Sequence, residues 1–498
     1  MTMEPSCHRR SPLPHQVRRS KTKELFNRRV GGEVEPTTLT DDVDITFWGA
    51  AGTVTGSRFQ VRTEHSQILV DCGQFQGDRA LRRRNWEQFP IDPATLDAVV
   101  LTHAHIDHSG YLPALVRDGF RGPIWCTRAT KDLCELLLRD SAMLQEEEAF
   151  YANKHKSSRH DPALPLFTIR DAEAALDLFE TRMFDHDFPI TDDMTASFSR
   201  VGHILGASCL RVEDGSSSIL FSGDVGRSND PIMRAPSLPP AADMLILEST
   251  YGDRLHAPTN PTEELAEIAV ETLGRGGILL IPSFAVGRSQ TILHLLAEMR
   301  WKGTIPDVPI FLNSPMAIDA TELMLEYSSE HRLSVDECER ISDGVIFTSS
   351  VEDSIELTRR SGPMIVLSAS GMATGGRVLH HLRQVLPQSN STVVFVGHQA
   401  AGTRGQLLID GAPSVRIFGE FIDVACSVKH IESLSAHADR DELVSWISCI
   451  SQPPTKTYIV HGEPSAAESM CNEIETRLHW PVDIAIHGET VRVPSKLD

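Results

Sequence analysis

Paired cysteines, long apolar runs and an excess of basic side chains are all missing from this chain of 498 residues. Its nine cysteines form no Cys-x-x-Cys pair, which argues against disulfides and a structural zinc knuckle and predicts a reducing, cytoplasmic setting. No apolar stretch approaches the ~20 residues of a membrane span, and no hydrophobic signal core lies near the start. With 41% hydrophobic and 23% charged residues, the composition is typical of a soluble globular protein of two or three domains.

The formal net charge of -21 argues against tight, nonspecific binding to long duplex DNA, which requires a basic surface. Local basic patches and bound metal ions can still attract a polyanion, so a short or single-stranded nucleic acid entering a cleft fits better. The first 30 residues carry eight Arg and Lys against two acids. Low apolar content and the lack of periodicity predict that residues 1–42 are a disordered basic tail, either simply solvated or an RNA-binding or targeting segment.

The segment Thr102–Gly110 concentrates potential metal ligands. It reads Thr-His-Ala-His-Ile-Asp-His-Ser-Gly and follows Ala98–Leu101, an apolar run typical of a buried strand. Its potential ligands are His103, His105, Asp107 and His108. Neutral imidazoles and carboxylates bind borderline divalent ions such as zinc, and these groups would be costly to desolvate as mere core residues. The cluster therefore predicts a metal site large enough for two ions.

Further potential ligands follow other apolar runs, each close to a glycine. They are Asp71, His203, Asp224 and His461. Each alone is weak evidence, because an aspartate at a strand end is more often a turn former. The shared pattern indicates that together they complete a two-ion site.

These motifs resemble, in the right order, the metal-binding motifs of the metallo-β-lactamase superfamily. Further segments resemble its β-CASP branch, whose members are nucleases and include RNA-cleaving enzymes. These segments are Leu247–Gly252, Pro282–Arg288, Ser314–Ala317, Ser370–Gly376, Gly397–Thr403, Ser435–Asp439 and Val460–Glu463. The resemblance covers roughly Asp44 to His487 and implies an α/β fold, an αββα metallo-β-lactamase sandwich with an inserted parallel-sheet β-CASP domain.

Hydrophobic patterning supports that division. From Asp44 the pattern is strand-rich, with a helix predicted over Thr130–Ala152, and two antiparallel sheets between helices would suit this part. From about Pro258 to Gly419, strands alternate with helices, which predicts a small parallel sheet. Its predicted strands are Gly277–Pro282, Pro309–Leu312, Met364–Ser368 and Thr392–Val396.

Ligands precede and follow this second region, so it must be an insertion, and the active site is expected in the cleft between the two parts. We therefore divide the chain into the tail 1–42, the first part of the metallo-β-lactamase domain 43–252, the inserted domain 253–424 and the completing segment 425–498.

The resemblance implies a role for each ligand. One zinc ion would be held by His103, His105 and His203, and Asp224 would bridge it to a second ion. The ligands of the second ion would be Asp107, His108 and His461. Asp71 would orient a ligand or the metal-bound water from outside. Zinc is preferred on ligand softness, with manganese as the alternative.

Two such ions, about 3.5–4 Å apart, lower the pKa of a shared water to about 7 and clamp both oxygens of an in-line phosphoryl displacement. The leaving ribose oxygen needs a proton, for which His437, polarised by Glu248, is the candidate general acid. Asp107 and Asp71 complete the predicted catalytic set. A satisfied buried histidine and a strand-end acid capping a turn are the alternatives for His437 and Glu248.

Substrate phosphate contacts are expected at Arg288 after a strand, at Ser435, and in the glycine-rich segment Ser370–Gly376 that opens a predicted helix. The candidates in that segment are Ser370, Gly371, Met372 and Thr374. Ordinary loop structure is the alternative for all of them. No Lys-Ser/Thr follows the two glycines, so the segment is not a Walker loop and ATP binding is not expected.

The favoured hypothesis is a zinc-dependent ribonuclease that cuts single-stranded RNA internally, with 5′-to-3′ trimming as an additional mode. One alternative is a metallohydrolase for a small ester or thioester, although such a substrate needs no inserted domain. The other is a noncatalytic RNA-binding scaffold, although such relatives lose metal ligands and none is missing here. The resemblance is also compatible with a homodimer, and no membrane partner is expected.

Overall fold

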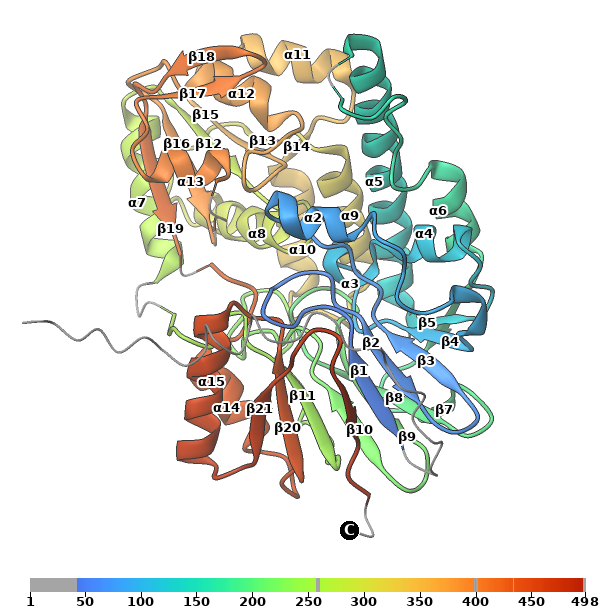
Figure 1. The fold of residues 1–498 in the computed structure, drawn as a ribbon. Helices are drawn as coiled ribbons and strands as arrows, with labels where there is room; N and C mark the ends of the chain where they lie inside the picture. Colours follow the sequence, from blue (N-terminus) through green and yellow to red (C-terminus); the bar gives the residue numbers. More distant parts are fainter. Residues whose placement is uncertain are drawn as a thin grey trace, which may run out of the picture. The chain divides into compact units, whose positions relative to one another are not determined.

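The computed structural model describes residues 43–156, 158–256, 260–397, 399, 402–432 and 434–495, all within one structural unit that spans residues 41–498 (Figure 1). The predicted basic tail, residues 1–42, lies outside the described residues. Across the described ranges, no helix combines the length and apolar character needed to cross a membrane.

Two seven-stranded sheets form the part of the molecule that holds both chain ends of the described region. The first sheet contains β22 (Thr490–Arg492), β1 (Asp44–Phe47), β2 (Phe59–Arg62), β3 (Gln67–Val70), β4 (Ala98–Val100), β5 (Ile124–Thr127) and β6 (Phe179–Arg182), in this order. The second contains β21 (Val482–Ile484), β20 (Lys456–Val460), β11 (Met244–Glu248), β10 (Ser218–Phe221), β9 (Ser208–Glu213), β8 (Thr195–Arg200) and β7 (Phe188–Pro189).

Alternation along the strands builds the layers of this sandwich. On β3, Ile68 and Val70 point into a core shared with Phe198 and Phe221 of the second sheet. Leu69 points the other way, into a core shared with the helices. Because β3 contributes residues to both cores, it is buried on both faces. Burial on both faces gives the predicted helix–sheet–sheet–helix layering.

The expectation of antiparallel sheets is wrong, because both sheets are mixed. Strands β3 to β6 run parallel to one another, and so do β10, β11, β20 and β21. The connections explain this. Helices α5 (Arg128–His155) and α6 (Ile169–Leu176) carry the chain from β5 to β6, and α15 (Pro464–Arg477) carries it from β20 to β21. A helical crossover brings the chain back to the end of the sheet at which the previous strand began, so the next strand runs parallel to it.

The second region is an all-parallel sheet of six strands. Its order is β14 (Ile346–Phe347), β13 (Ile310–Leu312), β15 (Met364–Ser368), β12 (Ile278–Pro282), β16 (Thr392–Val396) and β19 (Ser427–Ile431). All four predicted strands are confirmed to within one residue at each end. Because β19 belongs to this sheet, the sheet continues past residue 424, the predicted end of the inserted domain.

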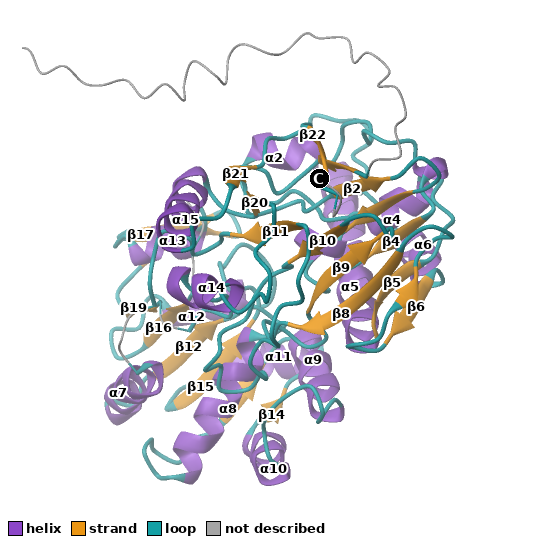
Figure 2. Cartoon of the chain, turned by 90° about the horizontal axis from the view of Figure 1, so that it is seen from below, coloured by secondary structure: helices purple, strands orange, loops and turns teal. Residues whose placement is uncertain are grey.

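Helices cover both faces of the parallel sheet (Figure 2). One face packs against α7 (Pro261–Gly274), α8 (Arg288–Trp301), α9 (Pro315–Glu326) and α10 (Val335–Gly344). The other packs against α11 (Val351–Arg359), α12 (Val378–Val385) and α13 (Arg404–Ile409). Burial on both faces explains why the strands read as continuous apolar runs. A separate hairpin joins β17 (Ser414–Ile417) to β18 (Glu420–Asp423).

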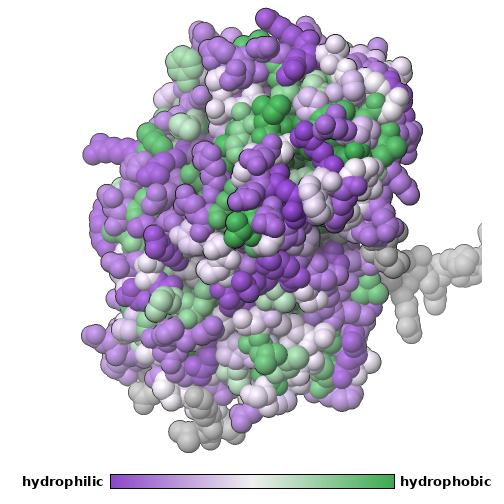
Figure 3. All heavy atoms as spheres, turned by 180° about the vertical axis from the view of Figure 1, so that it is seen from behind, coloured by the Kyte–Doolittle hydropathy of each residue, from purple (hydrophilic) through white to green (hydrophobic). Residues whose placement is uncertain are grey.

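The parallel-sheet region is inserted between two neighbouring strands of the sandwich. β11 and β20 are far apart in sequence yet pair in parallel along their whole length. The described remainder of the sandwich consists of α2 (Arg79–Arg84), a 3-10 turn (Pro93–Thr95), α3 (Ile106–Ser109), α4 (Leu112–Arg117) and α14 (Arg440–Ile447). Seen from behind, the surface is mostly hydrophilic, with hydrophobic side chains in separate patches (Figure 3).

Candidate metal centre

Loops at one end of the sandwich strands deliver the predicted ligands to a single place. His103 and His105 follow β4, and helix α3 adds the side chains of Asp107 and His108. His203, Asp224 and His461 follow β8, β10 and β20, which are strands of the second sheet. The centre therefore lies where the ends of both sheets meet.

Backbone strain marks several of these positions. Asp71, His203 and His461 have φ angles of 58°, 30° and 49°, in the left-handed region that L-residues rarely adopt. Such conformations cost about 1–3 kcal/mol each and persist where the surroundings enforce them. Gly73 allows the backbone to approach the ligand loop closely, because a Cβ there would lie 1.6 Å from the carbonyl oxygen of Asp107.

Three imidazole nitrogens converge in a first group. His105 Nδ1 lies 3.2 Å from His103 Nε2 and 3.1 Å from His203 Nε2. Asp224 Oδ2 completes the group, 3.4 Å from His103 Nε2 and 3.5 Å from His203 Nε2. These four atoms form a donor set that could hold one ion.

A second group lies on the other side of Asp224. His108 Nε2 is 3.2 Å from His461 Nε2, which in turn is 3.5 Å from Asp107 Oδ2. Asp224 Oδ1 is 3.4 Å from His108 Nε2, so each oxygen of this carboxylate faces one group. Asp224 therefore stands where a bridging ligand is required.

The residues present fit divalent cations. Asp224 Oδ1 is buried and has no hydrogen-bond partner among the described residues, although a buried carboxylate oxygen without a donor is costly. Burial, reinforced by His103, lowers the pKa of His105 to about 3, and burial lowers the pKa values of His103 and His203 as well. A neutral imidazole can present a nitrogen lone pair to a metal ion, so three such nitrogens that converge on one place suit a shared cation.

Carboxylates add the electrostatic attraction for a cation. Burial raises the pKa of Asp224, but the neighbouring imidazoles of His461, His108 and His103 hold this pKa well below its usual range. Burial alone would lower the pKa of His108, but Asp224 and Asp71 raise it well above the usual value. The centre therefore favours positive charge at the position of the second group.

Side chains outside the two groups orient the imidazoles. Asp71 Oδ2 accepts from His108 Nδ1 at 2.8 Å and is itself held by the hydroxyl of Thr102 at 2.9 Å. This contact leaves His108 Nε2 free to bind a metal. Thr250 was not predicted from the sequence, and its hydroxyl lies 3.0 Å from His461 Nδ1. Its position two residues after Glu248, inside the motif Leu247–Gly252, could have pointed to it.

His437 and Glu248 lie together beside the first group. His437 Nδ1 is 3.4 Å from Glu248 Oε1, and its ring centroid is 4.4 Å from that of His203. Glu248 is fixed by Val225 N–H, which donates to Oε1 at 2.6 Å. Burial lowers the pKa of His437, but the carboxylate of Glu248 raises this pKa above its usual value. His437 is thus biased towards the protonated form.

A cavity of about 980 Å³ opens beside the centre, between the sandwich and the inserted region. Its lining includes His203, Arg288 and Ser435, and residues from both regions. Arg288 Nη1 is buried there with no hydrogen-bond partner in the described part of the chain, and burial lowers the pKa of this guanidinium. A cleft between the two parts was predicted, and the cavity lies in that position.

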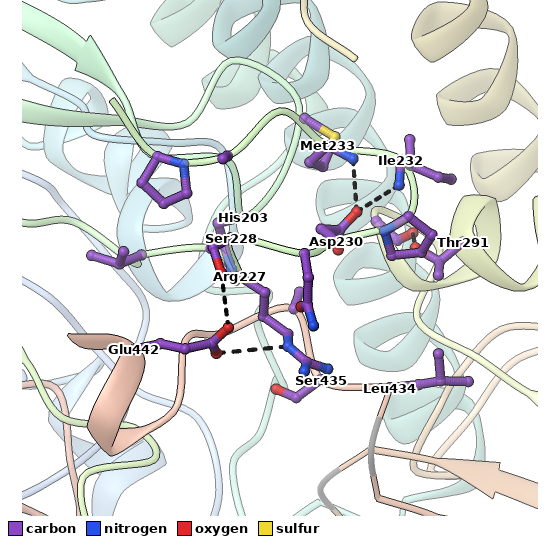
Figure 4. A pocket seen from close by; sticks show the side chains of 18 of the residues that line it. His203, Arg227, Ser228, Asp230, Ile232, Met233, Thr291, Leu434, Ser435 and Glu442 are labelled. Carbon is purple, nitrogen blue, oxygen red and sulfur yellow. Dashed lines mark hydrogen bonds and ion pairs between the residues drawn. The ribbon is translucent and has the colours of Figure 1, made fainter. Parts of the chain in front are cut away.

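Most other features of this cavity escaped the sequence analysis. Arg227 and Ser228 are directed toward Glu442, and Asp230 accepts hydrogen bonds from the backbone of Ile232 and Met233 (Figure 4). Apart from Glu442, these residues lie in the segment after Asp224, which carries no recognisable ligand motif. The segment also contacts the inserted region, where Arg332 donates to the carbonyl oxygens of Ser228 and Ile232.

The glycine-rich candidates lie elsewhere. Ser370, Gly371, Met372 and Thr374 are not among the residues that line the cavity. The helix predicted after this segment is confirmed as α12, which begins at Val378, so the segment lies just before the helix rather than within its first turn. Ser370 Oγ instead accepts from Thr374 N–H at 3.1 Å, which forms a turn before the helix.

Comparisons with known proteins agree with this architecture. Residues 59–266 match the metallo-beta-lactamase superfamily, residues 289–408 the Beta-Casp domain, and residues 422–485 the Zn-dependent metallo-hydrolase RNA specificity domain. Ribonuclease TTHA0252 of Thermus thermophilus is 38% identical over 454 residues, which cover 90% of this chain and 99% of that protein. The chain belongs to the β-CASP branch of the metallo-β-lactamase superfamily.

Other relatives of this β-CASP protein carry different names. Transcription termination factor FttA of Methanothermobacter thermautotrophicus is 29% identical over 500 residues, 95% of this chain and 76% of that protein. A solved structure of a protein of unknown function from Enterococcus faecalis V583 covers 91% of the chain with a TM-score of 0.52 and 15% identity, which shows a shared fold alone. The predicted family and the predicted class of metal-dependent hydrolase are therefore confirmed.

Proposed function

We propose that this β-CASP protein is a zinc-dependent ribonuclease that hydrolyses phosphodiester bonds within single-stranded RNA, with 5′-to-3′ trimming as an additional mode. The observation that carries the proposal is the convergence of six side chains in two groups on either side of Asp224, with His437 and Glu248 alongside. The match to an RNA specificity domain at residues 422–485 supports RNA as the substrate.

In this proposal, His103, His105 and His203 would hold one zinc, and Asp224 would contribute to both sites. The ligands of the second zinc would be Asp107, His108 and His461. When bound, the two ions supply an activated water and neutralise the charge of the attacked phosphate, with manganese as the alternative metal. Asp71 keeps His108 in the tautomer that presents Nε2 to the metal side.

His437 donates the proton that the leaving group needs. Its Nδ1 faces Glu248, so Nε2 remains for the substrate. The attacking oxygen comes from a water that has already given one proton to the solvent; as it forms its bond to phosphorus, the bond between phosphorus and the leaving ribose oxygen breaks, and the leaving oxygen takes the proton of His437. The raised pKa of His437, caused by Glu248, keeps this proton available near neutral pH.

Arg288 and Ser435 are the proposed phosphate contacts. A buried guanidinium nitrogen without a partner is costly, and a phosphate oxygen in the cavity would satisfy it. Ser370, Gly371, Met372 and Thr374 are not part of this proposal, since the cavity does not include them and the hydroxyl of Ser370 is already bonded to Thr374.

Cleavage of end-labelled single-stranded RNA, with matched DNA and a small thioester as controls and with or without a chelator, tests the proposal. We expect cleavage of RNA that the chelator abolishes and added zinc restores. Turnover of the thioester alone would instead identify a small-substrate hydrolase. Zinc-loaded protein that binds RNA without cutting it would identify a scaffold.

A further inference from the structure

The chain passes between the sandwich and the inserted region twice, and the two crossings touch beside His437. The outgoing crossing follows β11 and contains His256, and the returning crossing follows β19 and contains His437. The two backbones are joined directly where Arg440 N–H donates to the carbonyl oxygen of Arg254 at 3.2 Å. The general acid therefore lies on a junction between the two regions.

His256 bonds to the carbonyl group of the general acid and to the residue two positions after it. Its Nε2 lies 2.9 Å from the carbonyl oxygen of His437, and its backbone N–H donates to Asp439 Oδ2 at 2.9 Å. The side chain is only 5% exposed, and its ring centroid is 5.4 Å from that of Tyr251. Because a carbonyl oxygen can only accept, the Nε2 of His256 must be the protonated nitrogen.

His256, Asp439 and Glu442 also lie close enough together to be metal ligands, but their polar atoms are already used. His256 Nε2 is engaged by the His437 carbonyl oxygen. Asp439 Oδ1 accepts from Glu442 N–H at 2.9 Å, and Glu442 Oε2 accepts from Asp439 N–H at 3.1 Å. This reciprocal capping starts helix α14 and makes the group a hydrogen-bond network that anchors the His437 segment.

We propose that His256 is a positioning residue for the general acid, an inference that rests on the proposed function of His437. Glu248 holds the imidazole of His437, and Ser435 Oγ accepts from its backbone N–H at 3.2 Å. His256 holds the carbonyl end of the same residue from the other crossing. Without this donor the imidazole is no longer fixed relative to the leaving oxygen, and a misplacement of about 1 Å costs ~100-fold in rate.

The test compares His256→Ala with His256→Gln, whose side-chain amide can also donate a hydrogen bond. The control is His294→Ala, which removes a buried histidine from α8, away from the general acid. We expect His256→Ala to lower kcat on RNA by about 10- to 100-fold with KM and zinc content unchanged, and His256→Gln to restore most of the loss. His294→Ala should keep the wild-type kcat.

A modified substrate shows whether the loss acts through His437. In RNA with sulfur in place of the leaving ribose oxygen, the leaving thiolate needs no proton, because thiols ionise near pH 8.5. His256→Ala should cleave this linkage at the wild-type rate. A wild-type kcat of His256→Ala on ordinary RNA would overturn the inference, and so would a loss of equal size on the sulfur substrate.

Hydrogen exchange separates this inference from the proposed function, because it needs no catalysis. The amides of residues 434–439 should exchange faster in zinc-loaded His256→Ala than in wild type, with protection restored in His256→Gln and unchanged in His294→Ala. Wild-type protein that cleaves no RNA would refute the proposed function. Unchanged exchange in His256→Ala would refute the positioning role, whether or not the protein is a nuclease.

Discussion

At the scale of single residues, the centre buries side chains whose burial costs free energy unless a cation or hydrogen-bond donor is present. Asp224 is 2% exposed, has one oxygen without a hydrogen-bond partner, and faces imidazoles on both sides. A buried carboxylate of this kind is stabilised only by cations or donors. The same argument applies to the neutral imidazoles of His103, His105 and His203, whose nitrogens point at one another.

Asp107 tests the second group. Asp107→Ala removes the carboxylate next to His461 and should reduce bound zinc from two ions per chain to about one. RNA cleavage should fall by at least ~100-fold, since even outer partners of metal ligands are worth 10- to 100-fold. Metal analysis with a cleavage assay measures both. Asp118→Ala, which removes only an exposed ion pair with Arg117, serves as control and should leave zinc and rate unchanged.

His437 should separate metal binding from proton transfer. His437→Ala is expected to retain both zinc ions, because no metal ligand is removed. Turnover on RNA should drop by about 10²- to 10⁴-fold, the usual contribution of general acid catalysis. Loss of zinc from this variant would reassign His437 from proton donor to ligand.

At the scale of elements, close backbone contacts set the position of helix α3. Gly73→Ala would place a methyl group against the carbonyl of Asp107 and displace the helix that carries Asp107 and His108. We expect a loss of about 1–3 kcal/mol in unfolding free energy and weaker zinc binding, measured by thermal unfolding and metal titration. Gly274→Ala at the end of α7 meets no atom within 4 Å and should cause neither effect.

Features of these elements that follow from local sequence could be predicted, whereas those that depend on distant partners could not. The convergence of His103, Asp224 and His461 could be predicted because each follows an apolar strand, a local pattern that survives without knowledge of the partner strands. The parallel pairing of β3 to β6 could not, since pairing direction depends on where α5 and α6 return the chain. Thr250 and the capped turn at Ser370 escaped for a related reason. Their roles depend on the His461 imidazole and on side-chain contacts, which composition and periodicity do not encode.

At the scale of the whole molecule, the metal centre joins distant parts of the chain. Asp107 and His461 are separated by more than 350 positions, yet their side chains meet across the two sheets. Ions bound between them should therefore stabilise the folded state as well as catalyse. A ligand at one hundred times its Kd adds about 2.7 kcal/mol to the free energy of unfolding.

Chelation should reveal this contribution. Removing zinc from the wild type should lower Tm in calorimetry, and restoring zinc should reverse the change. His437→Ala should show the same shift, because its ligands are intact, whereas Asp224→Asn should show a clearly smaller one. Equal shifts in all three proteins would mean that the ions bind elsewhere.

The most direct test of the two-metal centre is anomalous diffraction at the zinc absorption edge from crystals of the zinc-loaded protein. Two zinc peaks are expected, one on each side of the Asp224 carboxylate. One should lie next to His103, His105 and His203, and the other next to Asp107, His108 and His461. A single peak, or peaks remote from Asp224, would contradict it.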